Sequence, residues 1–129
     1  MLIALLVPFE AWACRCMEPT LQDAYASADV VAMVQIREVV ALADGVVRTT
    51  GEAIQSWKSD VPYTLHIFAG DNCMYALESD GIYLLYLTRG KSGDFGTSRC
   101  RGNRHEAEAA DSLLWLTRYG RRSTIRISQ

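Results

Sequence analysis

The chain has 129 residues, of which 50% are hydrophobic and 22% charged, and its formal net charge is −2 at pH 7. A chain this close to neutral gives no electrostatic reason to expect nucleic acid or an anionic membrane as its main partner. Its length suits one domain with one core, and no repeat or low-complexity tract indicates a second domain.

Residues 1–13 have the pattern of a secretory signal peptide. Their apolar run is too short for a membrane-spanning helix, which needs about 20 apolar residues. Ala11 and Ala13 are small residues at the two positions that a signal peptidase reads, although no basic residue precedes the apolar run. We therefore expect a mature domain of residues 14–129 that begins at Cys14 and is secreted, periplasmic or extracellular. The alternative is that the apolar run forms a short buried strand.

A cysteine directly after a signal peptide is also where lipoproteins are modified. The preceding Ala-Trp-Ala fits that pattern poorly, because Trp12 is bulky and the third residue before Cys14 is not leucine-like. Lipid on Cys14 would also leave three cysteines, an odd number. We therefore favour cleavage without lipidation, which an intact mass would distinguish.

Four cysteines in a short exported chain indicate two disulfides. Cys14 and Cys16 are two residues apart, so a bond between them would close a strained small ring. In an extended chain both sulfurs point to the same side while Arg15 points away. Either Cys14 pairs with Cys73 and Cys16 with Cys100, or Cys14 pairs with Cys100 and Cys16 with Cys73; the spacing does not choose between them. Either pattern would fix a chain start that otherwise frays.

A short helix and a long strand are expected next. Thr20 should cap the helix, with Asp23 three residues later as in a capping box, and Asp29 should end it. A β-branched run over residues 30–42 predicts a strand with one core face, and its alternation slips near Glu38, as at a bulge. The expected buried positions are Leu21, Ala24, Tyr25 and Ala28 in the helix and Ala32, Val34 and Ile36 in the strand.

Four further strands are expected before the last helix. An Asp44-Gly45 turn should lead into the first of them, over residues 46–58, with Gly51 as a bend. Residues 82–87 are apolar on both faces and should form the most buried strand. The other two strands are expected at residues 62–68, where Tyr63, Leu65 and Ile67 share a face, and at residues 95–100.

The last expected element is a helix over residues 106–119, followed by a basic tail over residues 121–129. Gly120 should end this helix in the left-handed conformation. Its expected buried stripe is Ala107, Ala110, Leu113, Leu114 and Thr117, with Trp115 off the stripe. The order of helix, five strands and helix predicts a mainly β protein with two helices and a five-stranded, closed or half-closed barrel.

Several motifs of the chain occur together in one known family. Cys-Arg-Cys at residues 14–16 is followed by Asp-Ala-Tyr-Ala-Ser-Ala-Asp-Val-Val at residues 23–31. Gly-Ile-Tyr-Leu-Leu-Tyr-Leu follows at residues 81–87, and Thr-Ser-Arg-Cys at residues 97–100 precedes a helix. This combination resembles the tissue inhibitors of metalloproteinases (TIMPs), whose mature chains begin with C-x-C and a short helix ending in A-[FY]-x-x-A-D-[VI]-V. The resemblance covers essentially the whole mature chain, and in the family it corresponds to the N-terminal domain.

The resemblance implies a netrin-like module built on an OB-type barrel, with disulfides Cys14–Cys73 and Cys16–Cys100. It also implies inhibition of a zinc metallopeptidase by the first mature residue. The α-amino group and the carbonyl oxygen of Cys14 would chelate the catalytic zinc of the partner and displace its water, since such zinc keeps one open position. An α-amine with a pKa of about 7.7–8.0 loses its proton to a metal readily at neutral pH.

The same resemblance places the flanking residues against the partner. Arg15 would enter the pocket beside the zinc, while Met17 and the Asp71-Asn72 loop would flank it. The family has a small Ser or Thr where this chain has Arg15, and a cation in an apolar pocket is costly unless an acid meets it. The chain also has Ala26 where the family has another cysteine, and a short loop at residues 43–45.

These differences keep a second hypothesis open, a non-inhibitory netrin-like binding module for a protein or polyanion partner. A polyanion would bind arginines of the C-terminal third. The alternative is that these arginines only form a solvated surface. The arginines concerned are Arg99, Arg101, Arg104, Arg121 and Arg122.

A metal site or an active site in this chain is not expected. The disulfides use the sulfurs of Cys14 and Cys16, which leaves His66 and His105 without partner ligands. Two histidines with no serine or acid companion do not predict a hydrolase. We expect His66 on an exposed strand face and His105 exposed near a helix start. No enzymatic activity, cofactor, nucleic-acid partner or transmembrane segment of the mature chain is predicted.

Overall fold

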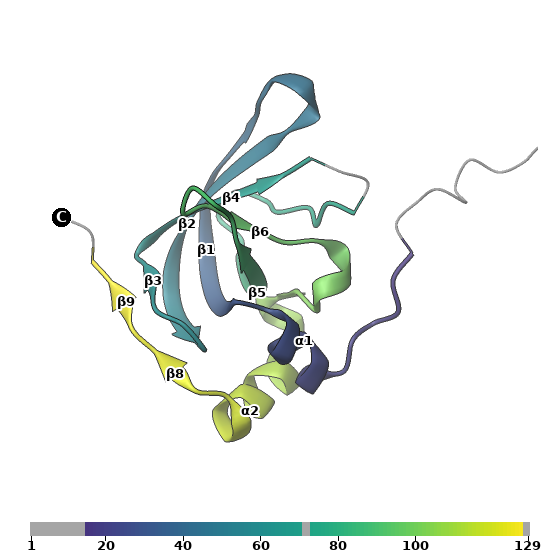
Figure 1. Ribbon diagram of the computed structural model, residues 1–129, viewed down its shortest axis with the longest axis vertical. Coiled ribbons are helices and arrows are strands. Elements are labelled where there is room, and N and C mark those ends of the chain that lie inside the picture. Colours follow the sequence, from purple (N-terminus) through teal and green to yellow (C-terminus); the bar gives the residue numbers. More distant parts are fainter. Residues whose placement is uncertain (1–14, 71–72, 128–129) are drawn as a thin grey trace, which may run out of the picture.

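Five strands close into a barrel in the computed structural model, which describes residues 15–70 and 73–127 (Figure 1). β1 pairs antiparallel with both β2 and β5, while β6 pairs parallel with β4 and antiparallel with β5. The order β1-β2-β4-β6-β5 therefore returns to β1 and gives the predicted OB-type barrel. The barrel strands are β1 (Val30–Ala41), β2 (Val47–Trp57), β4 (Thr64–Ala69), β5 (Ile82–Arg89) and β6 (Phe95–Gly96).

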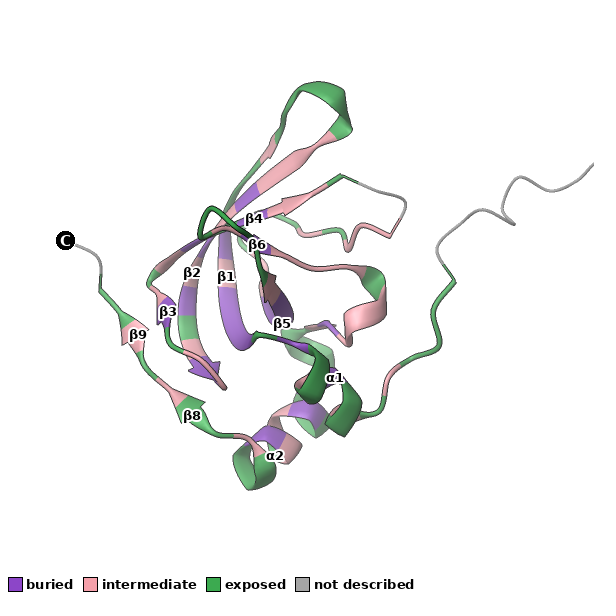
Figure 2. Ribbon diagram, viewed as in Figure 1, coloured by how far each residue is buried: buried purple, intermediate pink, exposed green. Residues whose placement is uncertain are grey.

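The first half of β1 is buried on both faces (Figure 2). Ala32, Val34 and Ile36 point into the barrel, as the alternation predicts. Val31 and Met33 point out of the barrel, but they are buried with residues of the two helices. The prediction of a single core face is therefore wrong for this half of β1, because periodicity cannot reveal that another element covers the outer face. The prediction that β5 is buried on both faces is confirmed.

β1 bends where the sequence predicts a bulge. Its register with β2 shifts between Ile36 and Glu38, and a second shift between Met33 and Val34 was not predicted. Gly51 lies opposite Ile36 in this ladder, and a Cβ there would overlap the Val34 side chain. A glycine at this bend therefore lets two strands approach closely inside a small barrel.

Helix α1 (Leu21–Ser27) begins as the capping pattern predicts, with Thr20 Oγ1 accepting a hydrogen bond of 3.1 Å from the Asp23 amide. Lys58 holds its other end. The Lys58 ammonium donates to the carbonyl oxygens of Tyr25 at 2.7 Å, Ala26 at 3.0 Å and Ala28. A cation here satisfies carbonyls that lack partners in the helix and interacts favourably with the helix dipole.

The second predicted helix is divided in two. Residues Glu106–Glu108 form a 3-10 turn capped by His105 Nδ1, and α2 (Ala110–Tyr119) begins after a break at Ala109. The predicted stripe is confirmed only at Leu113, which packs against the core. Its other members are exposed, Leu114 to 66%, because α2 packs on the barrel through the neighbouring face of the helix. The positions that do pack inward are Ala109, Ser112 and Leu116, with Leu113 and Trp115 half-buried.

The C-terminal tail forms two short strands that pair with β2 and β3. Gly120 has φ −78°, so the left-handed end predicted for it is wrong, and the chain passes directly into β8 (Arg122–Ser123) beside β2. β9 (Ile125–Arg126) then pairs in parallel with β3 (Val61–Pro62).

The third predicted strand is also shorter than expected. Leu65 and Ile67 are buried in β4 as predicted, whereas Tyr63 lies between β3 and β4, is 40% exposed and does not share their face. The Asp44-Gly45 turn is confirmed, with positive φ at both residues.

Replacing Lys58 by methionine should lower the free energy of unfolding by about 2 kcal/mol, because the carbonyls at the end of α1 would lose a charged donor while the aliphatic stem remains. Urea denaturation measures this. Lys91→Met, at an exposed loop position, is the matched control and should change stability by less than about 0.5 kcal/mol. Equal effects of the two substitutions would contradict the capping role.

Candidate functional site: the tethered N-terminal segment

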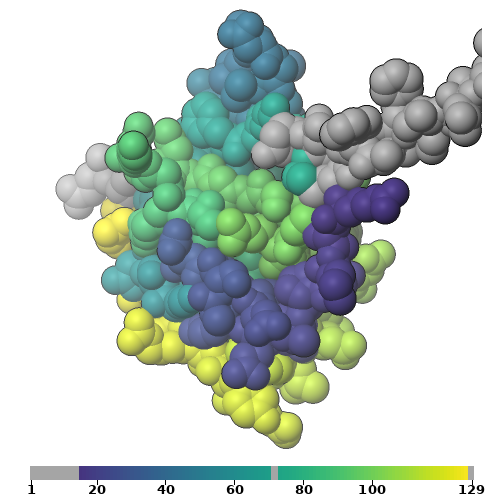
Figure 3. Space-filling view, turned by 45° about the vertical axis from the view of Figure 1, so that its right-hand side comes forward, coloured from purple at the N-terminus to yellow at the C-terminus, as the bar shows by residue number. Residues whose placement is uncertain are grey.

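Residues 15–18 form an extended, exposed segment that precedes α1 and lies outside the barrel. The Cys16–Cys100 disulfide, with its Cα atoms 5.2 Å apart, joins this segment to the body of the protein. Met17 is 92% exposed, and Figure 3 shows the segment, in dark purple, projecting from the surface. Glu18 forms an ion pair with Arg104, which attaches the segment a second time.

A single turn of 3-10 helix (Arg99–Arg101) lies where the cysteine-bearing segments converge. It contains Cys100, and its Arg99 amide donates a 2.8 Å hydrogen bond to the Cys73 carbonyl oxygen. Ser98 caps the turn by accepting from the Cys100 amide at 3.3 Å. The predicted strand over residues 95–100 is therefore wrong beyond Gly96, because the chain leaves β6 there to form this turn.

Asn103 fixes this turn to the barrel. Its side chain is almost fully buried and accepts a 2.7 Å hydrogen bond from the Tyr86 amide on β5. It donates to Thr97 Oγ1 at 2.8 Å and to the Ser98 carbonyl oxygen at 3.0 Å. Thr97 Oγ1 in turn donates to the Tyr86 carbonyl oxygen at 2.8 Å. Both backbone groups of Tyr86 are thus satisfied by side chains in the gap between β6 and β7 (Arg104–His105).

Gly102 lets the turn approach α1 closely. Its φ is 99°, a left-handed conformation that favours glycine. A Cβ at this position would lie 3.0 Å from the Ala24 Cβ and 3.5 Å from Pro19 Cγ. The turn, α1 and the start of the described chain therefore form one packed unit. Neither Gly102 nor Asn103 was identified from the sequence. A glycine can indicate a position with positive φ, so Gly102 is the one of the two that the sequence could have indicated.

The structure brings together part of the predicted site. Arg15, Cys16 and Met17 are exposed neighbours, and the Cys16–Cys100 bond is the one that the resemblance implies. Cys14 and the Asp71-Asn72 loop lie outside the described residues. The Cys14–Cys73 pairing and the zinc-chelating amine therefore stay predictions. No described cysteine is free.

The five arginines proposed for a polyanion belong to two segments of the structure. Arg99, Arg101 and Arg104 lie near the N-terminal segment, where Arg101 donates to the Ser27 carbonyl oxygen at 3.4 Å. Arg121 and Arg122 lie at the far edge of β2, and Arg121 donates to the Lys58 carbonyl oxygen at 2.9 Å. Both groups contact α1, since Arg101 donates to the Ser27 carbonyl oxygen and the Arg121 amide donates to Tyr25 Oη.

The shifted pKa values lie away from the N-terminal segment. Hydrogen bonds from the Tyr63 hydroxyl and the Arg37 guanidinium hold the pKa of the half-buried Glu52 below its usual value, and the carboxylate raises the pKa of Tyr63. Burial raises the pKa of the Tyr86 phenol, an effect that the Ser112 hydroxyl opposes. His66 and His105 are both exposed, as predicted.

Neither a metal cluster nor a membrane-spanning helix is found in the described part of the chain. No three His, Cys, Asp or Glu residues within residues 15–70 and 73–127 are grouped so that they could hold a metal ion. Both α-helices there are too short and too polar to cross a bilayer. No protein-family model matches the chain, and no curated protein sequence matches it.

Trypsin should separate the two disulfides, because the cleavage sites place each cysteine in a different peptide. Cleavage after Arg15 divides Cys14 from Cys16, Cys73 lies within residues 59–89, and Cys100 within residues 100–101. Mass spectrometry of the unreduced digest should show residues 16–37 joined to 100–101, and the Cys14 peptide joined to 59–89. The mass of the Cys14 peptide also reports whether residues 1–13 and a lipid are present. Exchanged pairs would contradict the predicted arrangement.

Asn103→Ala should lower the free energy of unfolding by about 3 kcal/mol, because the Tyr86 amide would be buried without an acceptor. Thermal unfolding followed by circular dichroism measures this. Gln22→Ala, which removes an exposed side-chain amide, serves as the control and should change stability by less than about 0.5 kcal/mol. Unchanged stability of the Asn103 variant would show that the amide network is dispensable.

Proposed function

We propose that the mature chain is a TIMP-like inhibitor of zinc metallopeptidases that acts through the amine and carbonyl groups of Cys14. The observation that supports this best is the Cys16–Cys100 disulfide, which fixes an exposed segment directly after the predicted cleavage site. A chain start held in this way loses little conformational entropy when it enters the cleft of a partner. Ordinary chain termini, by contrast, fray and would have to be ordered on binding.

The chemistry of chelation requires only groups that every freed N-terminus has. The amine nitrogen and the carbonyl oxygen of one residue close a five-membered ring on a metal. Catalytic zinc holds three protein ligands and exchanges the water in its remaining position, so a bidentate ligand can displace the nucleophile. This chain differs from an ordinary N-terminus because Cys16, two residues after Cys14, is joined by a disulfide to the Arg99–Arg101 turn.

Arg15 restricts the choice of partner. Its side chain is exposed and makes no hydrogen bond or ion pair within the described residues, so it is available to a partner. A guanidinium that enters a pocket loses hydration and needs a carboxylate, to which it binds through paired hydrogen bonds. The target is therefore a zinc metallopeptidase with an acidic residue in the pocket beside its zinc.

Blocking the Cys14 amine should abolish inhibition. Two forms test this: mature protein acetylated at the N-terminus, and protein with one alanine added before Cys14. Residual activity is measured against a panel of zinc metallopeptidases with acidic and apolar pockets. Inhibition by the unmodified protein should also weaken about tenfold for each pH unit below about 7, because the protonated amine cannot bind zinc.

The matched control carries one alanine after Gln129, which leaves the N-terminus unchanged and should inhibit fully. Full inhibition by both blocked forms would refute chelation by the amine. Partner binding that is weakened by salt but indifferent to the block would instead support the netrin-like binding module.

A further inference from the structure

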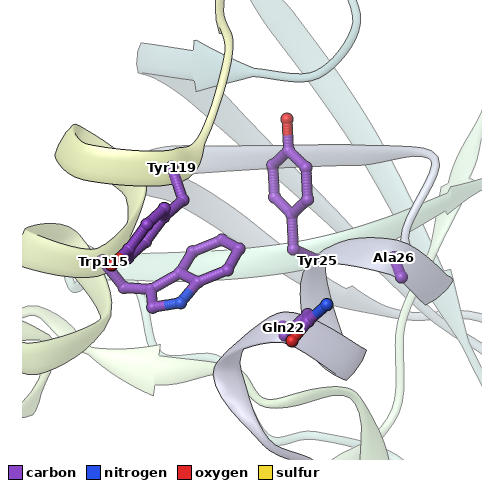
Figure 4. Close-up of a pocket in the computed structure, with 5 residues that line it drawn as sticks. All are labelled: Gln22, Tyr25, Ala26, Trp115 and Tyr119. Carbon is purple, nitrogen blue, oxygen red and sulfur yellow. The ribbon is translucent and has the colours of Figure 1, made fainter.

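An open groove of about 630 Å³ lies between α1 and α2 (Figure 4). Gln22, Tyr25 and Ala26 line it from α1, and Trp115 and Tyr119 from α2. The Trp115 ring centroid lies 5.5 Å from that of Tyr25 and 5.4 Å from that of Tyr119, so Trp115 contacts both tyrosine rings. Tyr119 is 63% exposed. The groove shares no lining residue with the N-terminal segment.

Charge argues against an ionic ligand. None of the lining residues is charged, so the groove offers neither a carboxylate for a cation nor a guanidinium for an anion. A cation is further disfavoured because the Lys58 ammonium already lies 5.2 Å from the Tyr25 ring centroid. The groove therefore suits a neutral ligand with apolar surface for the rings.

Two polar groups of the groove, on Tyr25 and Trp115, are available as donors. Tyr25 Oη accepts from the Arg121 amide at 3.0 Å, which leaves its own proton to donate. Within the described residues, the indole N–H of Trp115 and the amide of Gln22 make no hydrogen bond. A ligand that matches aromatic rings with free donors has exposed carbonyl oxygens and apolar rings of its own.

Proline-rich chain in the polyproline II conformation has these properties. Prolines lack an N–H group, and the carbonyl oxygens of this helix make no internal hydrogen bonds. We propose that the groove between α1 and α2 binds a proline-rich segment of a partner protein. This inference is independent of the proposed protease inhibition.

The test uses the disulfide-intact protein and two synthetic decapeptides, one rich in proline and one with alanine at every proline position. In nitrogen-15 NMR spectra, the proline peptide should shift the Trp115 indole N–H signal, and the alanine peptide should not. Titration calorimetry should show binding of the proline peptide weakened about three- to tenfold by Trp115→Phe, which keeps a ring but removes the donor. Tyr119→Ser should weaken it similarly.

Leu114→Ser is the matched control, since Leu114 is exposed on the same helix but does not line the groove. It should leave the affinity unchanged. Three results would each overturn the proposal: no shift at millimolar proline peptide, equal binding of the alanine peptide, or a shift caused only by a neutral oligosaccharide such as cellotetraose. The last result would identify the groove as a glycan site. Unchanged thermal unfolding of each variant keeps these outcomes distinct from misfolding.

Discussion

The hydrogen bonds of the Asn103 side chain hold in place the turn to which the N-terminal segment is attached. A closed barrel needs every backbone group of its central strands paired. On the edge of β5 that faces away from β1, neither β6 nor β7 pairs with Tyr86. Asn103 and Thr97 supply the missing acceptor and donor. Because an unpaired buried amide is costly, this pairing holds the loop that leads to Cys100 in one position.

The Arg99–Arg101 turn beyond that loop attaches the N-terminal segment to the barrel. The Arg99–Arg101 turn is bonded to Asn103 through Ser98, to Cys73 through a backbone hydrogen bond and to Cys16 through a disulfide. The links to Cys73 and Cys16 join segments far apart in sequence, so the turn holds them together without a regular element of its own. A disulfide that spans 84 residues restricts the unfolded chain strongly, in addition to positioning the native one.

The features that sequence predicts are those set by local patterns. The Thr20 cap, the bulge near Glu38 and the doubly buried β5 follow from residue types at short spacing, and each is confirmed. The burial of Val31 under the helices and the phase of α2 depend on tertiary packing, which periodicity does not contain. Asn103 illustrates the same limit at the site, because a polar residue in a predicted loop gives no indication that it replaces part of a strand.

Helix α1 connects the two surfaces that we propose are functional. Ala24 packs against the turn that holds Cys100, while Tyr25, on the next position, faces α2 across the groove. The same short helix therefore sets the angle at which the chain start leaves the body and the separation of the aromatic rings. Seven residues are too few to hold a helix without tertiary support, so its geometry depends on Thr20 at one end and Lys58 at the other.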